Sequence, residues 1–242
     1  MDRKILGLSI NLLLLLFCFM PIRAQQNTDM PNDTTAIPLY NGAYIGVDLF
    51  GLGSNLFGGD FLSTEVSIEV SLKNRFYPIV EIGYGTTDTW SDYGTHYKSS
   101  APYFKIGMNY NTMFKKRNES HLFVGVRYAL SSMTYDIEQM PVTDPAWGGD
   151  LGSNPLLEDE YWGGSIPYHH TGMKASVHWF EVLAGVRVPI YKRIMMGWTI
   201  RMKSRLSSSV SEHGDPWYVP GFGTYGSSQI GFTYSIIYKL PF

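Results

Sequence analysis

Ser176 and His178 have the side-chain chemistry of a nucleophile and its base. They are two residues apart, so in a β-strand both would point from the same face. A serine hydroxyl becomes a nucleophile when a base accepts its proton within hydrogen-bond reach. No acid is clearly placed to orient His178, and the spacing alone is a weak signal. The pair is a weak candidate, and the sequence predicts no defined catalytic site.

Other acids and histidines fall in segments that read as loops. They could form an Asp–His or paired-carboxylate site, and His169 with His170 could ligate a metal. No defined ligand spacing and no twelve-residue calcium loop accompanies them. We therefore predict no metal, no cofactor and a solvated acidic surface. The residues in question are Asp88, Asp92, His96, His169, His170, Glu212, His213 and Asp215.

A second set of charges alternates with apolar residues, on what would be the inner face of a barrel. Eight strands enclose an interior that side chains just fill, so buried ions there must pair with each other or with trapped water. The favoured interpretation is a salt-bridged core that keeps the barrel shut, and the alternative is an ion path or a buried acid–base site. The set comprises Asp48, Glu65, Glu69, Glu81, Lys105, Arg127, Glu181, Arg187, Arg201, Lys203 and Lys239.

Positioning these charges requires strands, and alternation of apolar and polar residues recurs throughout the chain. The clearest case is the last segment, where Ile230, Phe232 and Tyr234 begin an apolar series at every second residue. Each predicted strand exceeds the roughly 9 to 11 residues that cross a bilayer when tilted. The predicted strands are 40–50, 61–72, 75–86, 101–113, 120–135, 174–190, 193–207 and 224–242.

The connectors between these strands alternate in length, which separates a barrel from a soluble sandwich. Residues 51–60, 87–100, 136–173 and 208–223 form the long ones, whereas 73–74, 114–119 and 191–192 are short. Short periplasmic turns, long extracellular loops and an even strand number are typical of outer-membrane barrels. Basic residues gather in the short turns and acidic ones in 136–173. We predict an all-β fold, an eight-stranded antiparallel up-and-down transmembrane β-barrel.

The N-terminus resembles an export signal. Arg3 and Lys4 precede an apolar run, with a small residue, Ala24, at a plausible cleavage site. We predict a signal peptide over 1–24, a flexible periplasmic leader over 25–39 and the barrel over 40–242. A membrane anchor is the alternative, as is a lipoprotein through Cys18, although Phe17 is bulky where a lipobox needs a small residue.

Composition supports this assignment and excludes other classes. Aromatic residues make up 15% of the chain and charged residues only 17%, with a mean hydropathy of -0.09. Removing the signal takes away Cys18, the single cysteine, and with it thiol chemistry. It leaves 16 basic and 20 acidic residues, which gives nucleic-acid binding no electrostatic support.

Aromatic residues in the predicted outer loops, among them Tyr218, allow two interpretations. They could pack into a cap that closes the barrel mouth, which we favour, or they could bind a sugar or a partner protein. The loop tryptophans are Trp90, Trp147, Trp162 and Trp217.

Phe242 ends the chain in an apolar alternation that includes Tyr238 and Leu240. This ending resembles the sorting signal that the barrel-assembly machinery recognises. Together with the stretches GLGSNLFGGD (51–60), PWYVPGFG (216–223) and YKLPF (238–242), it resembles a family of small Gram-negative outer-membrane barrels without assigned function. The resemblance implies fold and location but supplies no catalytic residue.

We therefore expect an integral outer-membrane protein, not an enzyme, with a structural or interaction role through its outer loops. Its expected partners are membrane lipid, lipopolysaccharide, the assembly machinery during biogenesis and an unidentified envelope protein. The alternative is a lipid-modifying or hydrolytic barrel enzyme, similar to lipid A deacylases, with Ser176 and His178 at the outer rim. A narrow ion pore is a third hypothesis.

Overall fold

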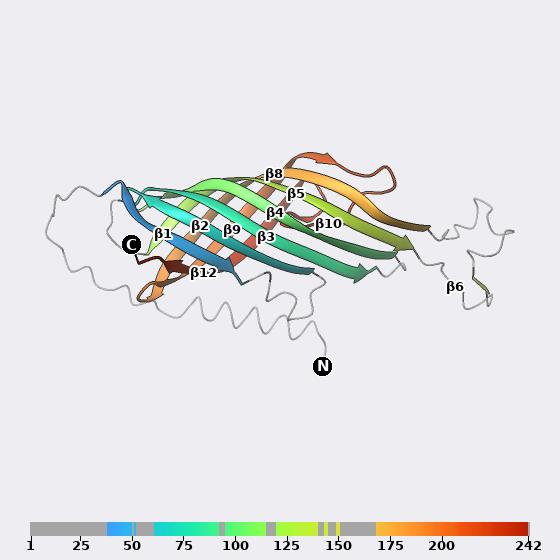
Figure 1. Ribbon diagram of the computed structural model, residues 1–242, viewed down its shortest axis with the longest axis horizontal. Helices are drawn as coiled ribbons and strands as arrows, with labels where there is room; N and C mark the ends of the chain where they lie inside the picture. Colours follow the sequence, from blue (N-terminus) through green and yellow to red (C-terminus); the bar gives the residue numbers. More distant parts are fainter. Residues whose placement is uncertain are drawn as a thin grey trace. The chain divides into compact units, whose positions relative to one another are not determined.

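Eight long strands form one closed ring in the structure, a computed structural model (Figure 1). It describes residues 38–49, 51, 61–91, 95–114, 120–139, 143–144, 149–150 and 168–241. The ring order is β1-β12-β9-β8-β5-β4-β3-β2 and each pairing is antiparallel, which confirms the predicted barrel. The strands are β1 (Tyr40–Asp48), β2 (Phe61–Leu72), β3 (Phe76–Trp90), β4 (Thr95–Asn111), β5 (His121–Gln139), β8 (Tyr168–Tyr191), β9 (Ile194–Ser209) and β12 (Ser228–Lys239).

Alternation along each strand separates an apolar outer wall from a packed lumen. In β5, Phe123, Ala129 and Tyr135 are buried inside, whereas Leu122 and Val124 on the other parity are exposed. Successive strand side chains point to opposite faces, so one parity fills the lumen and the other forms an exposed apolar belt. Soluble proteins rarely expose so continuous an apolar surface.

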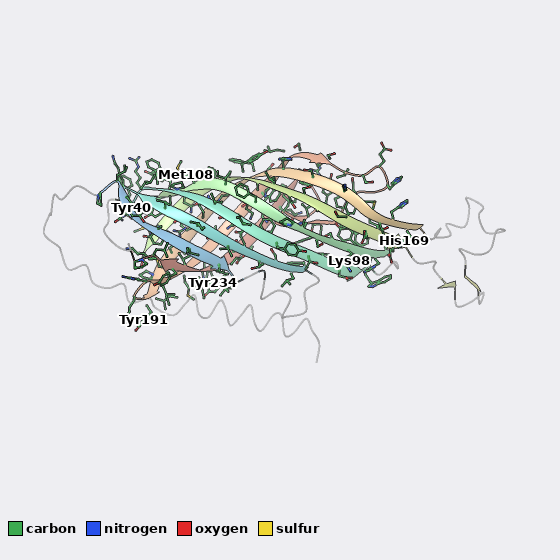
Figure 2. All side chains as sticks on the ribbon, viewed as in Figure 1. Tyr40, Lys98, Met108, His169, Tyr191 and Tyr234 are labelled. Carbon is green, nitrogen blue, oxygen red and sulfur yellow. The ribbon has the colours of Figure 1, made fainter. Side chains whose placement is uncertain are left out.

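The two ends of the barrel differ, and we name them the turn end and the loop end. The connectors 73–75 and 192–193 lie at the turn end. The start of β1 and the end of β12 lie there too, where Leu240 N donates to Ala43 O at 2.9 Å. Lys73 and Asn74 both have φ 53°, as tight antiparallel hairpins favour. Figure 2 labels Tyr40 and Tyr191 at this end, and Lys98 and His169 at the loop end.

The predicted strand boundaries were wrong at the loop end. Residues 87–100 and 136–173 were predicted as loops, yet β3 pairs with β4 up to Trp90↔His96 and β5 pairs with β8 up to Gln139↔Tyr168. These extensions are polar on their outer side, so they lack the lipid-facing signal that the prediction used. Conversely, β12 begins at Ser228 rather than at residue 224.

These extensions form a protruding sheet, residues 86–90, 95–102, 131–139 and 168–178. Its outer face carries polar side chains such as Lys98, Thr134 and Lys174. Its inner face is buried and mainly apolar, with Tyr97, Met133 and other residues in one cluster. A sheet that is polar on one side and apolar on the other must be covered on its apolar side.

Two small hairpins complete the described elements: β6 (Thr143–Asp144) with β7 (Gly149–Asp150), and β10 (Tyr218–Val219) with β11 (Gly223–Thr224). No helix among the described residues is long and apolar enough to cross a membrane. The predicted signal peptide and nearly all of the predicted leader lie outside the described residues.

Candidate functional site

The middle of the lumen holds a cluster of three carboxylates and three cations. Inward parity on six different strands brings them together, although their positions in the sequence are far apart. All six side chains are buried. The members are Glu65 on β2, Glu81 on β3, Lys105 on β4, Arg127 on β5, Glu181 on β8 and Arg201 on β9.

Arg201 contacts all three carboxylates. Its Nη1 donates to Glu81 Oε2 at 2.9 Å and to Glu181 Oε2 at 3.2 Å. Its Nη2 donates to Glu65 Oε1 at 3.1 Å. The planar guanidinium has several donors in a fixed arrangement, so one arginine can bridge carboxylates from three strands.

The other two cations complete the neutralisation of the carboxylates. Lys105 Nζ lies 2.7 Å from Glu65 Oε2 and 3.3 Å from Glu181 Oε1. Arg127 Nε donates to Glu81 Oε1 at 3.1 Å. Each carboxylate therefore meets at least two cations, which is the compensation that buried charge requires.

A further ion pair lies nearer the turn end and is joined to the cluster by an amide. Arg187 binds Glu69 through both terminal nitrogens, with Nη2 2.7 Å from Oε2. Asn109 Nδ2 donates to Glu69 Oε2 at 2.7 Å, and Asn109 Oδ1 accepts from Arg127 Nη2 at 2.8 Å. We call these eight ions and Asn109 the lumen network, in which four carboxylates balance four cations.

Two neutral residues that were not predicted from the sequence hold the network in place. Asn109 bridges its two parts, and Trp179 Nε1 donates to Glu181 Oε1 at 2.7 Å. Both lie at inward positions of their strands. Strand parity would have placed them in the lumen if hydrogen-bonding residues had been considered together with the charged ones. The remaining predicted lumen charges lie outside the lumen network.

Lys203 joins the lumen to an outer loop, with Nζ 2.7 Å from Gly221 O and 3.0 Å from Phe222 O. Asp48 lines a cavity of about 30 Å³ beside the network, space for one or two water molecules. Lys239 lies at the turn end, opposite Tyr44 in the β1–β12 ladder.

Apolar layers lie on both sides of the lumen network. Toward the turn end, Tyr44, Tyr77, Met195 and Ile237 form one buried cluster. Toward the loop end, a larger cluster includes Trp179 and the inner face of the protruding sheet. The ions are therefore enclosed between two apolar layers.

The connector from β9 to β12 folds into the loop end, and we name residues 210–227 the plug. Its β10–β11 hairpin points Val219 and Phe222 inward, and both are fully buried. The Phe222 ring meets the Trp179 ring edge-on, with centroids 5.7 Å apart. Gly221 has φ +80° and lies against the Tyr103 ring, so a side chain there would be both strained and obstructed.

Hydrogen bonds and rings attach the plug to the protruding sheet. Tyr97 donates to Tyr218 O at 2.8 Å, and Tyr135 donates to Gly214 O at 2.5 Å. Trp217 stacks on Tyr97 with centroids 5.5 Å apart. Trp217 and Tyr218, two of the predicted loop aromatics, therefore contact the protruding sheet. Burial raises the pKa of Tyr218 to about 12, so this phenol stays neutral.

The other predicted loop aromatics do not join the plug. Trp90 stacks on His96 near the β3–β4 tip, with centroids 4.4 Å apart, and is half exposed. Trp147 and Trp162 lie outside the described residues, as does Phe242 of the predicted sorting signal. Tyr238 faces outward in β12, and Leu240 follows the end of that strand.

Ser176 and His178 lie on the outer face of β8, as their spacing predicts. No hydrogen bond between them is found in the described part of the chain. His178 Nδ1 instead lies 2.9 Å from the Tyr128 hydroxyl on the neighbouring β5. The arrangement provides no oriented serine–histidine pair.

A chain of acids and histidines crosses the outer face near the tips of β3, β4, β5 and β8. His96 Nε2 lies 2.6 Å from Asp88 Oδ1, and His96 Nδ1 lies 3.7 Å from Glu138 Oε2. Glu138 Oε1 is in turn 3.0 Å from His169 Nδ1. The two carboxylates lie on different nitrogens of His96, so they do not converge on a common point.

The remaining loop candidates lie apart from this chain. His170 stacks on His213 of the plug, with centroids 4.6 Å apart and an interplanar angle of 2°. Glu212 and Asp215 also lie in the plug, and Asp92 is outside the described residues. Among the residues with described positions, no group of three or more His, Cys, Asp or Glu is arranged to hold a metal ion.

The contact with His96 has a consequence for acid pH. Its hydrogen bond lowers the pKa of Asp88 from the ordinary value of 3.8. A carboxyl with a depressed folded pKa stabilises the fold above the unfolded pKa, and the contribution is lost as the pH falls through the folded value. We expect His96→Ala to raise the pKa of Asp88, as measured by NMR titration of its carboxyl carbon.

Lys98→Gln is the matched control for this titration. Lys98 Nζ lies 3.7 Å from Asp88 Oδ2, and its effect on the carboxyl is weaker than that of His96. The variant should therefore move the pKa less. An unchanged titration in His96→Ala would contradict the assigned cause.

Residues 5–242 match the model of a family described as "Domain of unknown function (DUF6048)". No curated protein matches the chain. Two solved structures resemble it, Neisserial surface protein A (TM-score 0.43, 12% identity) and a major outer membrane protein from Thermus thermophilus (TM-score 0.45, 10% identity). Each match covers 83% of this chain and 99% of the other.

Proposed function

We propose that this chain, which belongs to the family of unknown function matched above, is a closed outer-membrane barrel that presents a recognition surface. The barrel serves as the membrane anchor, and the protruding sheet with the plug forms the surface. The proposed role is structural or interactive rather than enzymatic.

The outer wall supports insertion into a bilayer. Its apolar belt includes Ile82 and Ile200, exposed by 59% and 52%, and the last β12 residues of outward parity are apolar as well. Exposing such a surface to water costs free energy, whereas contact with hydrocarbon does not. Every strand of the ring is paired on both sides, which satisfies the backbone without solvent.

The lumen supports a closed barrel. The network fills its middle with mutually paired ions, and the plug and the turn-end cluster cover it on both sides. An eight-stranded barrel is also too narrow for an aqueous channel of the porin type. Conduction would require both apolar layers to move.

The protruding sheet is the observation that carries the proposal. A barrel that served only as an anchor would need no paired strands beyond its belt. Here four strands continue outward with a polar outer face, and their inner face is packed against the plug. The result is a rigid, solvent-directed surface, and rigid surfaces bind at a lower entropic cost than flexible loops.

Placement and orientation can be tested with single cysteines, because Cys18 in the predicted signal is the only cysteine of the sequence. We expect Thr134→Cys, on the protruding sheet, to react in intact cells with a maleimide that cannot cross membranes. Arg193→Cys, at the turn end, should react only after the envelope is permeabilised. Equal labelling of both, or recovery of the protein in a soluble fraction, would contradict the proposed placement.

Recognition can be tested with a photo-crosslinking amino acid at the same sheet. A probe at Thr134 should give discrete adducts with lipopolysaccharide or an envelope protein, while a probe at Ile106 in the belt should give phospholipid adducts. Identical adduct patterns from both positions would refute a recognition role for the sheet.

A further inference from the structure

At the turn end, one arginine is held among three aromatic rings. The Arg75 Cζ atom lies 5.1 Å from the Phe76 ring centroid, 5.2 Å from that of Tyr110 and 4.7 Å from that of Phe114. Each distance is within the roughly 6 Å at which a cation is attracted to a ring face. We name these four residues the arginine cage.

The cage is built by the local fold. Phe76 and Tyr110 are direct partners in the β3–β4 ladder, with ring centroids 5.6 Å apart, and Phe114 lies 6.1 Å from Tyr110. The backbone of Arg75 is fixed as well, since its N donates to Leu72 O at 3.0 Å and its O accepts from Asn111 N at 2.9 Å. The guanidinium is therefore positioned before any ligand arrives.

The N–H groups of Arg75 are available to a ligand. It is exposed, and within the part of the chain that the structure describes its side chain contacts these rings and no carboxylate. Rings attract the face of a guanidinium but leave its N–H edge available, and that edge matches the oxygens of a phosphate. Arg127, Arg187 and Arg201 are by contrast committed to carboxylates in the lumen network.

The apolar wall beside the cage identifies the kind of phosphate. The outward-facing β3–β4 pairs that follow Phe76↔Tyr110 are Pro78↔Met108 and Val80↔Ile106, and none of these residues is charged. Figure 2 labels Met108 on this part of the wall. A ligand that places its phosphate at Arg75 and lays acyl chains along this wall satisfies both surfaces.

We propose that the arginine cage is a binding site for the phosphate of an anionic phospholipid in the leaflet at the turn end. This rests on the proposed placement in a membrane. Lys73, Lys192 and Arg193 are exposed at the same end and add to the positive potential there. Lys192 Nζ also lies 5.1 Å from the centroid of the Tyr191 ring, which is a second contact between a cation and an aromatic ring at the turn end.

The test is native mass spectrometry of the processed protein in detergent with added phosphatidylglycerol. We expect Arg75→Gln to weaken binding of the first lipid about tenfold, as the loss of one charge-assisted contact implies. Phe114→Ala, which keeps the charge but opens the cage, should weaken it several-fold. The matched control is Arg193→Gln, which removes a charge from the same end and should change binding by less than about twofold.

Two further binding measurements identify the ligand. Phosphatidylcholine should bind more weakly than phosphatidylglycerol, and soluble glycerol 3-phosphate should not displace the lipid. Equal binding by wild type and Arg75→Gln, equal losses in Arg75→Gln and Arg193→Gln, or displacement by glycerol 3-phosphate would each overturn the proposal. Each variant must first insert into vesicles. Failure of the wild type to insert would contradict the proposed function, whereas insertion without cage-dependent binding contradicts this site alone.

Discussion

Replacing Arg201 with methionine is expected to lower the free energy of unfolding by about 3–5 kcal/mol, the usual cost of removing one partner of a buried ion pair. Arg201 contacts Glu65, Glu81 and Glu181, so its loss leaves three carboxylates with two cations. Methionine has a similar volume and leaves no large void. The measurement is equilibrium unfolding in urea from lipid vesicles, followed by tryptophan fluorescence.

Two controls separate charge imbalance from other effects. Arg193→Met removes a cation from the exposed turn end and should change the free energy of unfolding by less than about 0.5 kcal/mol. Adding Glu65→Gln to Arg201→Met restores the charge balance and should recover part of the loss. A cost below about 1 kcal/mol for Arg201→Met would contradict the view that the ions of the network are buried and compensate one another.

Replacing Phe222 with alanine is expected to release the plug and to cost about 3 kcal/mol, as for other buried phenylalanines. The ring is fully buried and packs on Trp179, so its removal leaves a cavity under the β10–β11 hairpin. The plug should then become a substrate for chymotrypsin at Trp217, Tyr218 or Tyr225. The measurement is the rate of cleavage in the folded, vesicle-inserted protein.

The matched control is Phe232→Ala, which removes the same side chain from the outer wall. Phe232 is 60% exposed and lies in the belt, outside the plug and its contacts. Cleavage of the plug should stay at the wild-type rate in this variant. If Phe222→Ala is also cleaved at the wild-type rate, the plug is not held by its buried ring.

Alternation along the strands was enough to predict the barrel, because a period of two residues shows which side chains share the apolar outer face and which share the lumen. It also placed Glu65, Lys105 and Arg201 on the inner face. It did not reveal their partners, since pairing depends on strand register and on the tilt of distant strands. The contact of Arg201 with Glu65 joins residues 136 positions apart.

The predictions were less accurate beyond the apolar belt. Beyond the belt, β4 continues with the polar run Lys98, Ser99 and Ser100, in which inner and outer positions are both polar. Such a run lacks the alternation of a strand and resembles a loop. The plug was predicted as aromatic cap residues but not as a hairpin, because its left-handed Gly221 and its fit against Tyr103 depend on the assembled wall. The arginine cage likewise needs Phe114 from a different turn.

The lumen network also constrains the order of events during assembly. Its ions come from six strands that are separated widely along the chain, so none of the carboxylates is fully compensated until those strands are side by side. Contacts between distant positions form slowly, since a long loop must close first. Unpaired buried charge is costly, so these side chains need water as partners while the ring is still open. That water can leave the interior only when the last of the six strands brings its ions into place.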